Sequence, residues 1–203
     1  MDRFNDAYRG ARSAPPWDIG RPQPAFVALA EQDAIRGSVL DAGCGTGEHT
    51  LYFASLGHES WGTDGSPLAI ERARQKALER GLAVEFSVHD ALTLEGLERT
   101  FDNVTDRGLF HIFGDEDRAR LVESLACVLG SGGRYFMLCF SDRQPGSEGP
   151  RRISQGEIRD VFSDGWRVDE IAEATITTLT FPFGAQAPSL SHGESAFRFC
   201  WAL

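Results

Sequence analysis

The chain has 203 residues, of which 41% are hydrophobic and 25% are charged, and its formal net charge is -10. This length can bury one substantial core and does not require a second domain, so we expect a single domain over residues 1–203. A mean hydropathy of -0.26 argues against a membrane span, and 30 acidic against 20 basic side chains would repel nucleic acid. Residues 1–6 lack the apolar core of a signal peptide, so we expect a soluble, cytoplasmic protein.

The four cysteines, Cys44, Cys127, Cys139 and Cys200, lie far apart in the sequence. None of them has a C-x-x-C or histidine-paired spacing that is typical of a metal site. We therefore expect four buried thiols and no metal.

The first 24 residues are rich in Pro, Gly and Trp and form an N-terminal arm. From there, short apolar runs alternate with helical patterns. The first half predicts helices over 26–35 and 48–56 and strands over 38–42 and 60–63. A helix over 66–80 is the clearest, because Ser66 and Pro67 are typical of a helix start and Gly81 of a helix end.

The second half continues the alternation. Residues 84–88 have the period of a half-covered edge strand, whereas 134–140 form an apolar run suited to a strand buried on both faces. We also predict a strand over 101–106, helices over 115–130 and 154–162, a loop over 142–150, and final strands over 166–171 and 196–202. The predicted fold is therefore α/β, with a mostly parallel sheet, helices on both faces and a last strand that runs antiparallel.

The strongest signal is an apolar strand that runs directly into Gly43, Gly45 and Gly47 and then into a helix. Alternating glycines let the backbone turn sharply and let a ligand approach it closely, so we expect a nucleotide-like ligand. A dinucleotide fingerprint has its third glycine one residue later, where this chain has Glu48. An acidic residue there would oppose a pyrophosphate, and this favours S-adenosylmethionine, which has no phosphate.

Two acidic residues follow at the ends of the next predicted strands. Asp64 is placed to accept hydrogen bonds from both ribose hydroxyls. Asp90 could accept from the adenine amine while the backbone N–H of Ala91 meets a ring nitrogen, although an Asp in this context can also simply cap a turn. These residues predict an adenosine site.

Residues 40–47, Asp64 and Asp90 together resemble the motifs of the class I S-adenosylmethionine-dependent methyltransferases. This resemblance implies a Rossmann-like, seven-stranded sheet with a reversed last strand. It also implies S-adenosylmethionine as cofactor and S-adenosylhomocysteine as product. The predicted cofactor-binding residues are Trp17, Asp41, Gly43, Gly45, Gly47, Asp64, Gly65, Ser66, Asp90, Ala91, Asp106 and Arg107.

Residues 14–24 and 106–111 resemble a narrower, small-molecule branch, which contains thiopurine, thiol and halide methyltransferases and hydroxyquinolone-type heterocyclic toxin methyltransferases. In this branch the Trp of the arm lies over the cofactor, which implies that Trp17 and the arm cover the site. The residue after the fourth-strand Asp lines the site, and Arg107 departs from the small or aromatic residue that is usual there. The branch implies a small-molecule substrate.

Methyl transfer from a sulfonium needs mainly alignment and a dry pocket. A hydroxyl or thiol acceptor could also need a general base, and His111, just after the fourth strand, is the candidate, although a buried structural histidine would fit the same pattern. Residues 177–194, with the aromatic run at 181–184, are either a substrate wall or a surface loop.

Two other functions remain open at this point. One is an NAD-linked oxidoreductase, which shares the sheet and Asp64 but should have a glycine at position 48. The other is a non-catalytic regulator that binds S-adenosylmethionine. The acceptor molecule, its accepting atom and the oligomeric state do not follow from the sequence.

Overall fold

The computed structural model of the protein describes residues 2–9, 15–147, 149–179 and 194–202. The helices and strands of this part, with η marking 3-10 helices, are α1 (Asp2–Arg9), α2 (Pro24–Glu31), β1 (Val39–Ala42), α3 (Glu48–Ser55), β2 (Ser60–Asp64), α4 (Pro67–Arg80), β3 (Glu85–Val88), η1 (Ala91–Leu97), β4 (Phe101–Arg107), η2 (Phe110–Ile112), α5 (Asp115–Val128), β5 (Leu129–Phe140), α6 (Gln155–Val161), β6 (Ile171–Leu179) and β7 (Glu194–Ala202).

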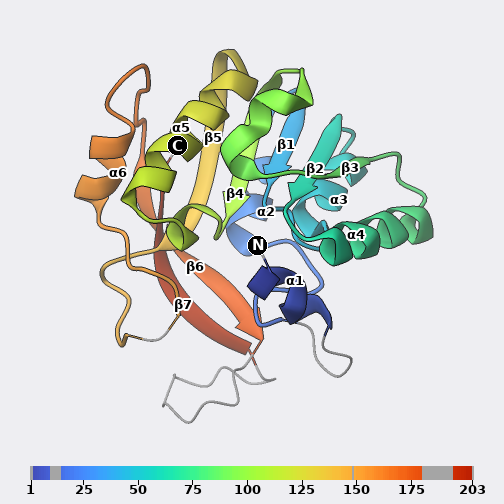
Figure 1. Cartoon of the computed structure of the whole chain (residues 1–203), viewed down its shortest axis with the longest axis horizontal. Coiled ribbons are helices and arrows are strands. Elements are labelled where there is room, and N and C mark those ends of the chain that lie inside the picture. Colours follow the sequence, from blue (N-terminus) through green and yellow to red (C-terminus); the bar gives the residue numbers. More distant parts are fainter. Residues whose placement is uncertain (1, 10–14, 148, 180–193, 203) are drawn as a thin grey trace.

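The strands form one seven-stranded sheet in the order β3-β2-β1-β4-β5-β7-β6 (Figure 1). Strands β1 to β5 pair in parallel, and β7 runs antiparallel to both β5 and β6. The order reverses at β1, with β2 on one side and β4 on the other. In open α/β sheets, ligands bind at such a switch point, outside the carboxyl ends of the strands.

The two faces of the sheet carry separate cores because side chains alternate along each strand. On β1, Leu40 and Ala42 pack with η1, α5 and α6, whereas Val39 packs with α2 and α3 on the opposite face. A third cluster joins α3 and α4 to Phe86 of β3. Helices therefore cover both faces, as the alternation of strands and helices predicts, and the α/β fold is confirmed.

Local sequence sets the ends of the helices. The Ser66 hydroxyl accepts from the amide of Ala69 at the start of α4, and Gly81 ends that helix at φ +64°. Ser154 and Glu157 form a capping box at the start of α6. These caps satisfy backbone groups that the helix itself leaves without partners.

Several predicted boundaries and elements are wrong. Strand β6 begins at Ile171 and not at residue 166, because Trp166 packs against Phe162 and Tyr135 from an unpaired segment. The N-terminal arm begins with helix α1, which the sequence prediction missed, and η1 was missed as well.

Of the cysteines expected to be buried, Cys127 is exposed, whereas Cys44 and Cys139 are buried. Within the described residues, no helix is long and apolar enough to cross a membrane.

Candidate active site

The turn between β1 and α3 has the conformation that its glycines allow. Gly43, Gly45 and Gly47 have φ values of +69°, +55° and +82°, in the left-handed region that other residues rarely adopt. Space is short as well: a Cβ on Gly47 would lie 2.8 Å from Cζ of Phe86, and one on Gly45 would lie 2.9 Å from the hydroxyl oxygen of Tyr8. The turn thus needs glycine for both conformation and room.

Asp64, at the end of β2, lies against this turn. Its Oδ2 accepts from the amide of Gly45 at 2.9 Å, and its Oδ1 accepts from the amide of Ser66 at 2.8 Å. Burial raises the pKa of Asp64, and the two amides oppose that rise. Each carboxylate oxygen can accept a second hydrogen bond, so the position suits the predicted ribose contact.

Asp41 is buried beneath the turn. Its carboxylate accepts from the hydroxyls of Thr50 on α3, at 2.8 Å, and Thr105 on β4, at 3.2 Å. Burial raises its pKa to about 7 against the lowering effect of these two hydroxyls. Asp41 therefore ties three elements together below the turn, and does not line the recess described next.

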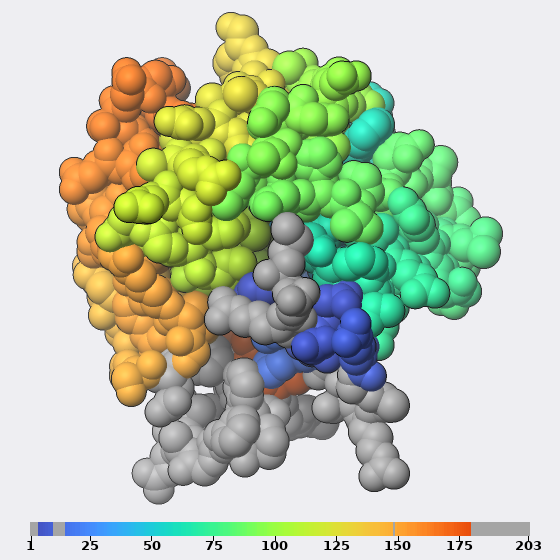
Figure 2. Space-filling view, in the orientation of Figure 1, coloured from blue at the N-terminus to red at the C-terminus, as the bar shows by residue number. Residues whose placement is uncertain are grey.

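The N-terminal arm lies over the turn. Trp17 Nε1 donates to the hydroxyl of Tyr8 on α1 at 2.9 Å, and the Trp17 carbonyl accepts from Arg107 Nη2 at 2.6 Å. On the next residue, the Asp18 carboxylate accepts from the hydroxyl of Thr46 at 2.9 Å. Figure 1 shows α1 close to the carboxyl ends of the central strands, and in Figure 2 its blue residues lie on the surface beside the teal ones of α4.

The start of α2 anchors the arm. The side chain of Gln23 donates to and accepts from the backbone of Thr177 on β6, at 2.8 Å in each direction. The amide of Gln23 donates to His49 Nε2 at 3.0 Å. Since Nε2 accepts, His49 is neutral, and burial lowers its pKa to about 3.

Between the arm and the turn lies a recess with a volume of about 290 Å³, its open mouth included. It brings together three of the residues predicted for the cofactor, namely Trp17, Gly45 and Arg107. Tyr8 lines it as well, and the sequence prediction missed this residue. The spacing of Phe4 and Tyr8, one helical turn apart in a polar stretch, could have indicated a helix with an apolar face there.

Glu48 also lines the recess, but its charge is neutralised. Its carboxylate accepts from Lys76 at 2.6 Å and from Arg80 at 2.9 Å and 3.0 Å, both on α4. The argument that Glu48 repels a pyrophosphate is therefore weaker than the sequence alone indicates. The cofactor assignment depends on the spacing of the glycines and on the relatives described below.

Asp106, one of the residues predicted for the cofactor, has partners within the protein. It is fully buried, and its carboxylate accepts from the amides of Leu109 and Phe110 and from the Tyr135 hydroxyl, at 2.6 to 2.8 Å. Burial raises its pKa to about 6 against these donors. Its register partner on β1, Ala42, belongs to the core cluster on the α5 face. Asp106 holds the end of β4 in shape, and it does not line the recess.

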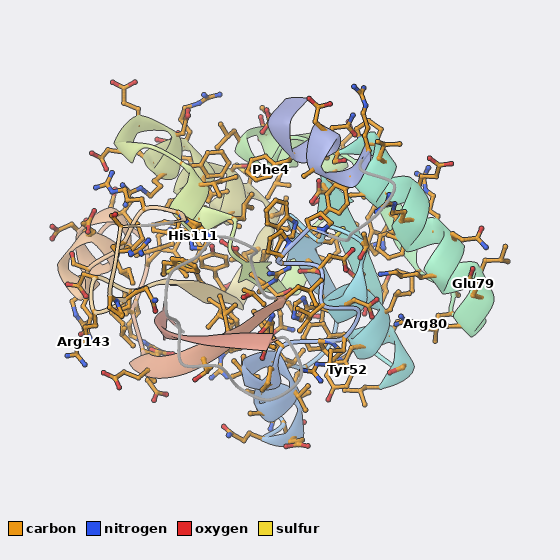
Figure 3. All side chains as sticks on the ribbon, turned by 90° about the horizontal axis from the view of Figure 1, so that it is seen from below. Phe4, Tyr52, Glu79, Arg80, His111 and Arg143 are labelled. Atoms are coloured by element: carbon orange, nitrogen blue, oxygen red, sulfur yellow. The ribbon has the colours of Figure 1, made fainter. Side chains whose placement is uncertain are left out.

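His111, the predicted base, lies in the interior of the molecule, whereas Glu79 and Arg143 project from its edges (Figure 3). Its Nδ1 accepts from the amide of Phe140 at 2.9 Å, so a neutral ring carries its proton on Nε2. Burial lowers the pKa of His111 to about 3. In this arrangement neither ring nitrogen has a free lone pair for a base, so the geometry speaks against the predicted role.

The adenine-side residues lie one strand further along the edge. Asp90 Oδ1 accepts from the amide of Leu92 and caps η1, as an Asp in a turn would, and Ala91 is buried. Gly65 separates Asp64 from Ser66, whose hydroxyl donates to Asn5 of α1.

Of the predicted substrate wall, residues 177–179 belong to β6, and 180–193 lie outside the described residues.

Three features of this part of the molecule suit a bound cofactor, namely the turn, Asp64 and the arm. The turn leaves a narrow space above Gly45, Asp64 has acceptor capacity beside it, and residues of the arm line the recess next to the turn. Among the described residues, no group of His, Cys, Asp and Glu could hold a metal ion. The residues fit a cofactor with an adenosine end at β2 and β3.

Comparisons with known proteins identify the family of the chain. The methyltransferase domain family matches residues 39–133. The 2-heptyl-1-hydroxyquinolin-4(1H)-one methyltransferase of Mycobacteroides abscessus is 38% identical over 184 residues, which cover 87% of this chain and 81% of that protein. Probable thiol methyltransferase 2 of Arabidopsis thaliana is 30% identical over 152 residues, which cover 73% and 67%.

A solved structure is similar over nearly the whole chain. It comes from work on the conversion of a disulfide bond into a thioacetal group during echinomycin biosynthesis. Its TM-score is 0.83 at 35% identity, with 99% of this chain and 91% of that chain covered.

The sheet order and the glycine turn define a Rossmann-like α/β fold, a class in which ligands bind at the switch point of the sheet. The identity to curated methyltransferases makes the family specific: the chain belongs to the class I S-adenosylmethionine-dependent methyltransferases. Its cofactor is S-adenosylmethionine, and the oxidoreductase and non-catalytic alternatives give way to an enzyme that transfers a methyl group.

Proposed function

We propose that the acceptor is a small molecule, either a flat heteroaromatic hydroxyl or amine or a thiol. The observation that carries this proposal is the arm. Trp17 and Tyr8 close over the glycine turn and line the small recess beside it. A folded macromolecule could not bring its acceptor atom beneath this arm.

The relatives support the same class of acceptor. The names of two of them specify a hydroxyquinolone and a thiol as the group that is methylated. Both are compact acceptors that ionise to nucleophilic anions. Trp17 lines the recess and packs edge-on against Phe4, with ring centroids 6.0 Å apart, and its aromatic ring suits a flat partner.

S-Adenosylmethionine supplies the electrophilic methyl group, and the protein provides position and a dry site. Asp64 would hold the ribose, the turn from Gly43 to Gly47 would let the cofactor approach the backbone, and the arm would exclude water. Asp41 and Asp106 keep the two flanking strand ends in place. In this proposal a base such as His111 is not required, because the acceptor binds in its ionised form.

The test is a panel assay of methyl transfer with purified protein. It would offer a hydroxyquinolone, an aromatic thiol, a halide, a peptide and an RNA, and would measure S-adenosylhomocysteine release. We expect turnover with the hydroxyquinolone or the thiol. Turnover with the peptide or RNA alone would overturn the proposal.

A further inference from the structure

The N-terminal arm is anchored on two sides, and the two sides differ in kind. On the β6 side the anchors are backbone groups of the strand: the Pro16 carbonyl accepts from the amide of Leu179 at 2.8 Å, and the Gln23 side chain binds the backbone of Thr177. On the α4 side the anchors are side chains of the helix. Side chains can change rotamer, so the α4 side is where the arm can lift without losing its main-chain bonds to the sheet.

Helix α4 presents a row of basic side chains to the arm and the glycine turn. Arg72, Lys76 and Arg80 are spaced four residues apart, so they lie along one face of the helix. Arg72 donates to the Tyr8 carbonyl of α1, which lies beside α4 in Figure 1. Within the described part of the chain, Arg80 binds the Glu48 carboxylate and no residue of the arm. Lys76, between the two, contacts both the turn and the arm.

Lys76 joins three segments of the molecule. Its ammonium donates at 2.6 Å both to the Thr46 hydroxyl in the turn and to the Glu48 carboxylate at the start of α3. The Thr46 hydroxyl donates to Asp18 Oδ1 of the arm at 2.9 Å, and the Lys76 ammonium lies 3.8 Å from the same oxygen. An ammonium, a hydroxyl and a carboxylate thus form a continuous chain from α4 through the turn to the arm.

The charge of Lys76 sets the direction of the Thr46 hydroxyl. An ammonium only donates, so the hydroxyl oxygen accepts from it and the single hydroxyl proton is left for Asp18. Thr46 is 4% exposed, and the side chains of Asp18 and Lys76 are 11% and 24% exposed, so water competes little for these bonds. Hydrogen bonds with a charged partner are stronger than neutral ones, and linked bonds strengthen one another. The chain therefore holds the arm firmly on the turn.

The closed arm stands in the way of a ligand that approaches the turn. Tyr8 is 3% exposed, and its hydroxyl lies so near the turn that a Cβ on Gly45 would be 2.9 Å from the hydroxyl oxygen. The same hydroxyl accepts from Trp17, the residue before Asp18. A cofactor that contacts the backbone of the turn needs this space. The arm therefore has to move when the cofactor enters and again when S-adenosylhomocysteine leaves.

We propose that Lys76 is a positioning residue that latches the arm onto the glycine turn, and that opening of the chain from Lys76 through Thr46 to Asp18 limits the rates of cofactor entry and product release. Within the described part of the chain, Lys76 does not line the recess, so it acts through Thr46 and Asp18 and not by touching the ligand. Its partners are protein groups, so weakening the latch favours opening of the free and of the bound protein alike. The proposal depends on the cofactor of the family and not on which acceptor is methylated.

The test is stopped-flow binding of S-adenosylhomocysteine to the full-length protein, followed by tryptophan fluorescence. In Lys76→Met we expect the association and dissociation rate constants both to rise about 10-fold, which corresponds to the loss of one hydrogen bond to a charged group, while Kd stays within about 2-fold of wild type. A residue that touches the ligand would instead raise Kd. A residue that only supports the fold would leave both rate constants unchanged.

Two further variants isolate the latch. Arg80→Met is the matched control, because it removes a cation one turn along α4 that also binds Glu48 but does not contact the arm, and its two rate constants should equal those of wild type. Asp18→Asn keeps the shape of the side chain but loses its charge, and it should speed both steps about 5-fold. Added to Lys76→Met, Asp18→Asn should change the rates little further, because the chain is already broken. Should Lys76→Met not fold, Asp18→Asn carries the test.

Salt gives a second readout. Raising KCl to about 0.5 M should speed both steps about 3-fold in wild type and hardly at all in Lys76→Met, because ions screen the attraction between Lys76 and the two carboxylates. Unchanged rate constants in Lys76→Met and Asp18→Asn, an equal acceleration in Arg80→Met, or the same salt dependence in wild type and Lys76→Met would overturn the latch. These measurements need no acceptor. Failure of the proposed function therefore shows separately, as absent turnover of small acceptors with the binding rates as described.

Discussion

The turn after β1 and the end of β4 lie side by side at one edge of the sheet, yet they hold their polar groups differently. At the turn, the backbone itself sets the positions of the polar groups: three glycines have positive φ, and Asp64 accepts hydrogen bonds from two nearby amides. At the end of β4, Asp106 and His111 bind partners from β5 and η2. Backbone conformation thus shapes the turn after β1, whereas side-chain bonds to β5 and η2 shape the end of β4.

The largest effect should come from Gly47→Ala, which tests the role of the backbone at the turn. A Cβ there would lie 2.8 Å from Phe86 and 3.0 Å from Ala73, at a φ of +82°. We expect the free energy of unfolding in urea to fall by about 3 kcal/mol, from strain and overpacking together. Gly57→Ala is the matched control, since its φ is +93° but nothing lies within 4 Å, and it should cost about 1 kcal/mol. Equal losses would show that space at the turn is unimportant.

The next effect concerns the acid on the turn side. Asp64→Asn should weaken the binding of S-adenosylhomocysteine about 30-fold, because a charged acceptor for ribose hydroxyls becomes a neutral one. Asp102→Asn is the control: this carboxylate also accepts from a backbone amide, that of Ser38, but lies at the amino end of the sheet. Calorimetry should find the affinity of Asp102→Asn for S-adenosylhomocysteine unchanged. A similar loss in both variants would mean that Asp64 acts through stability alone.

The comparison also shows how far sequence alone can reach. The turn glycines are predictable because backbone conformation dictates the residue type, and the caps of α4 and the bond from Ser66 to Asp64 because the partners lie within a few residues. The hydrogen bonds of Asp106 to Tyr135 and of His111 to the Phe140 amide were not predictable, because each partner lies 29 residues away along the chain. The position of these two residues near the end of a predicted strand indicated the correct edge of the sheet, but it did not indicate their hydrogen-bond partners.

Contacts between segments that are distant in sequence also explain why the partners of the arm and the start of β6 were not predicted. Trp17 was predictable from its sequence context, but its two partners, Tyr8 and Arg107, come from a helix and a strand end on either side of it. Residues 166–170 have strand-like alternation yet remain unpaired, because the apolar side chains of Trp166 and Val168 pack on the α5 face. Propensity favours a strand over residues 166–170 as well as over β6, and tertiary packing decides that only β6 pairs with the sheet.

On the β4 side, His111→Gln separates a buried structural histidine from a base. A neutral His with a folded pKa of about 3 and an unfolded value near 6.5 stabilises the fold above pH 6.5, and that stability is lost as pH falls toward 3. At pH 5 the loss for one such group is about 2 kcal/mol, and Gln removes this part of the acid sensitivity. Urea unfolding at pH 5 and 7.5 measures it. A base role would instead abolish turnover and the acidic limb of kcat/KM.

The smallest effect should come from Trp17→Phe, which tests how the arm joins the two regions. Phe keeps an aromatic ring over the site but removes the Nε1 donor to Tyr8, whereas the bond from Arg107 goes to the main-chain carbonyl and survives. We expect S-adenosylhomocysteine to bind about 5-fold more weakly, the value of one neutral hydrogen bond. Trp166→Phe, on the α5 face, controls for the change of ring and should leave the affinity unchanged. A 100-fold loss of affinity in Trp17→Phe would show that the indole bond to Tyr8, and not the bond from Arg107 to the Trp17 carbonyl, is what mainly holds the arm over the site.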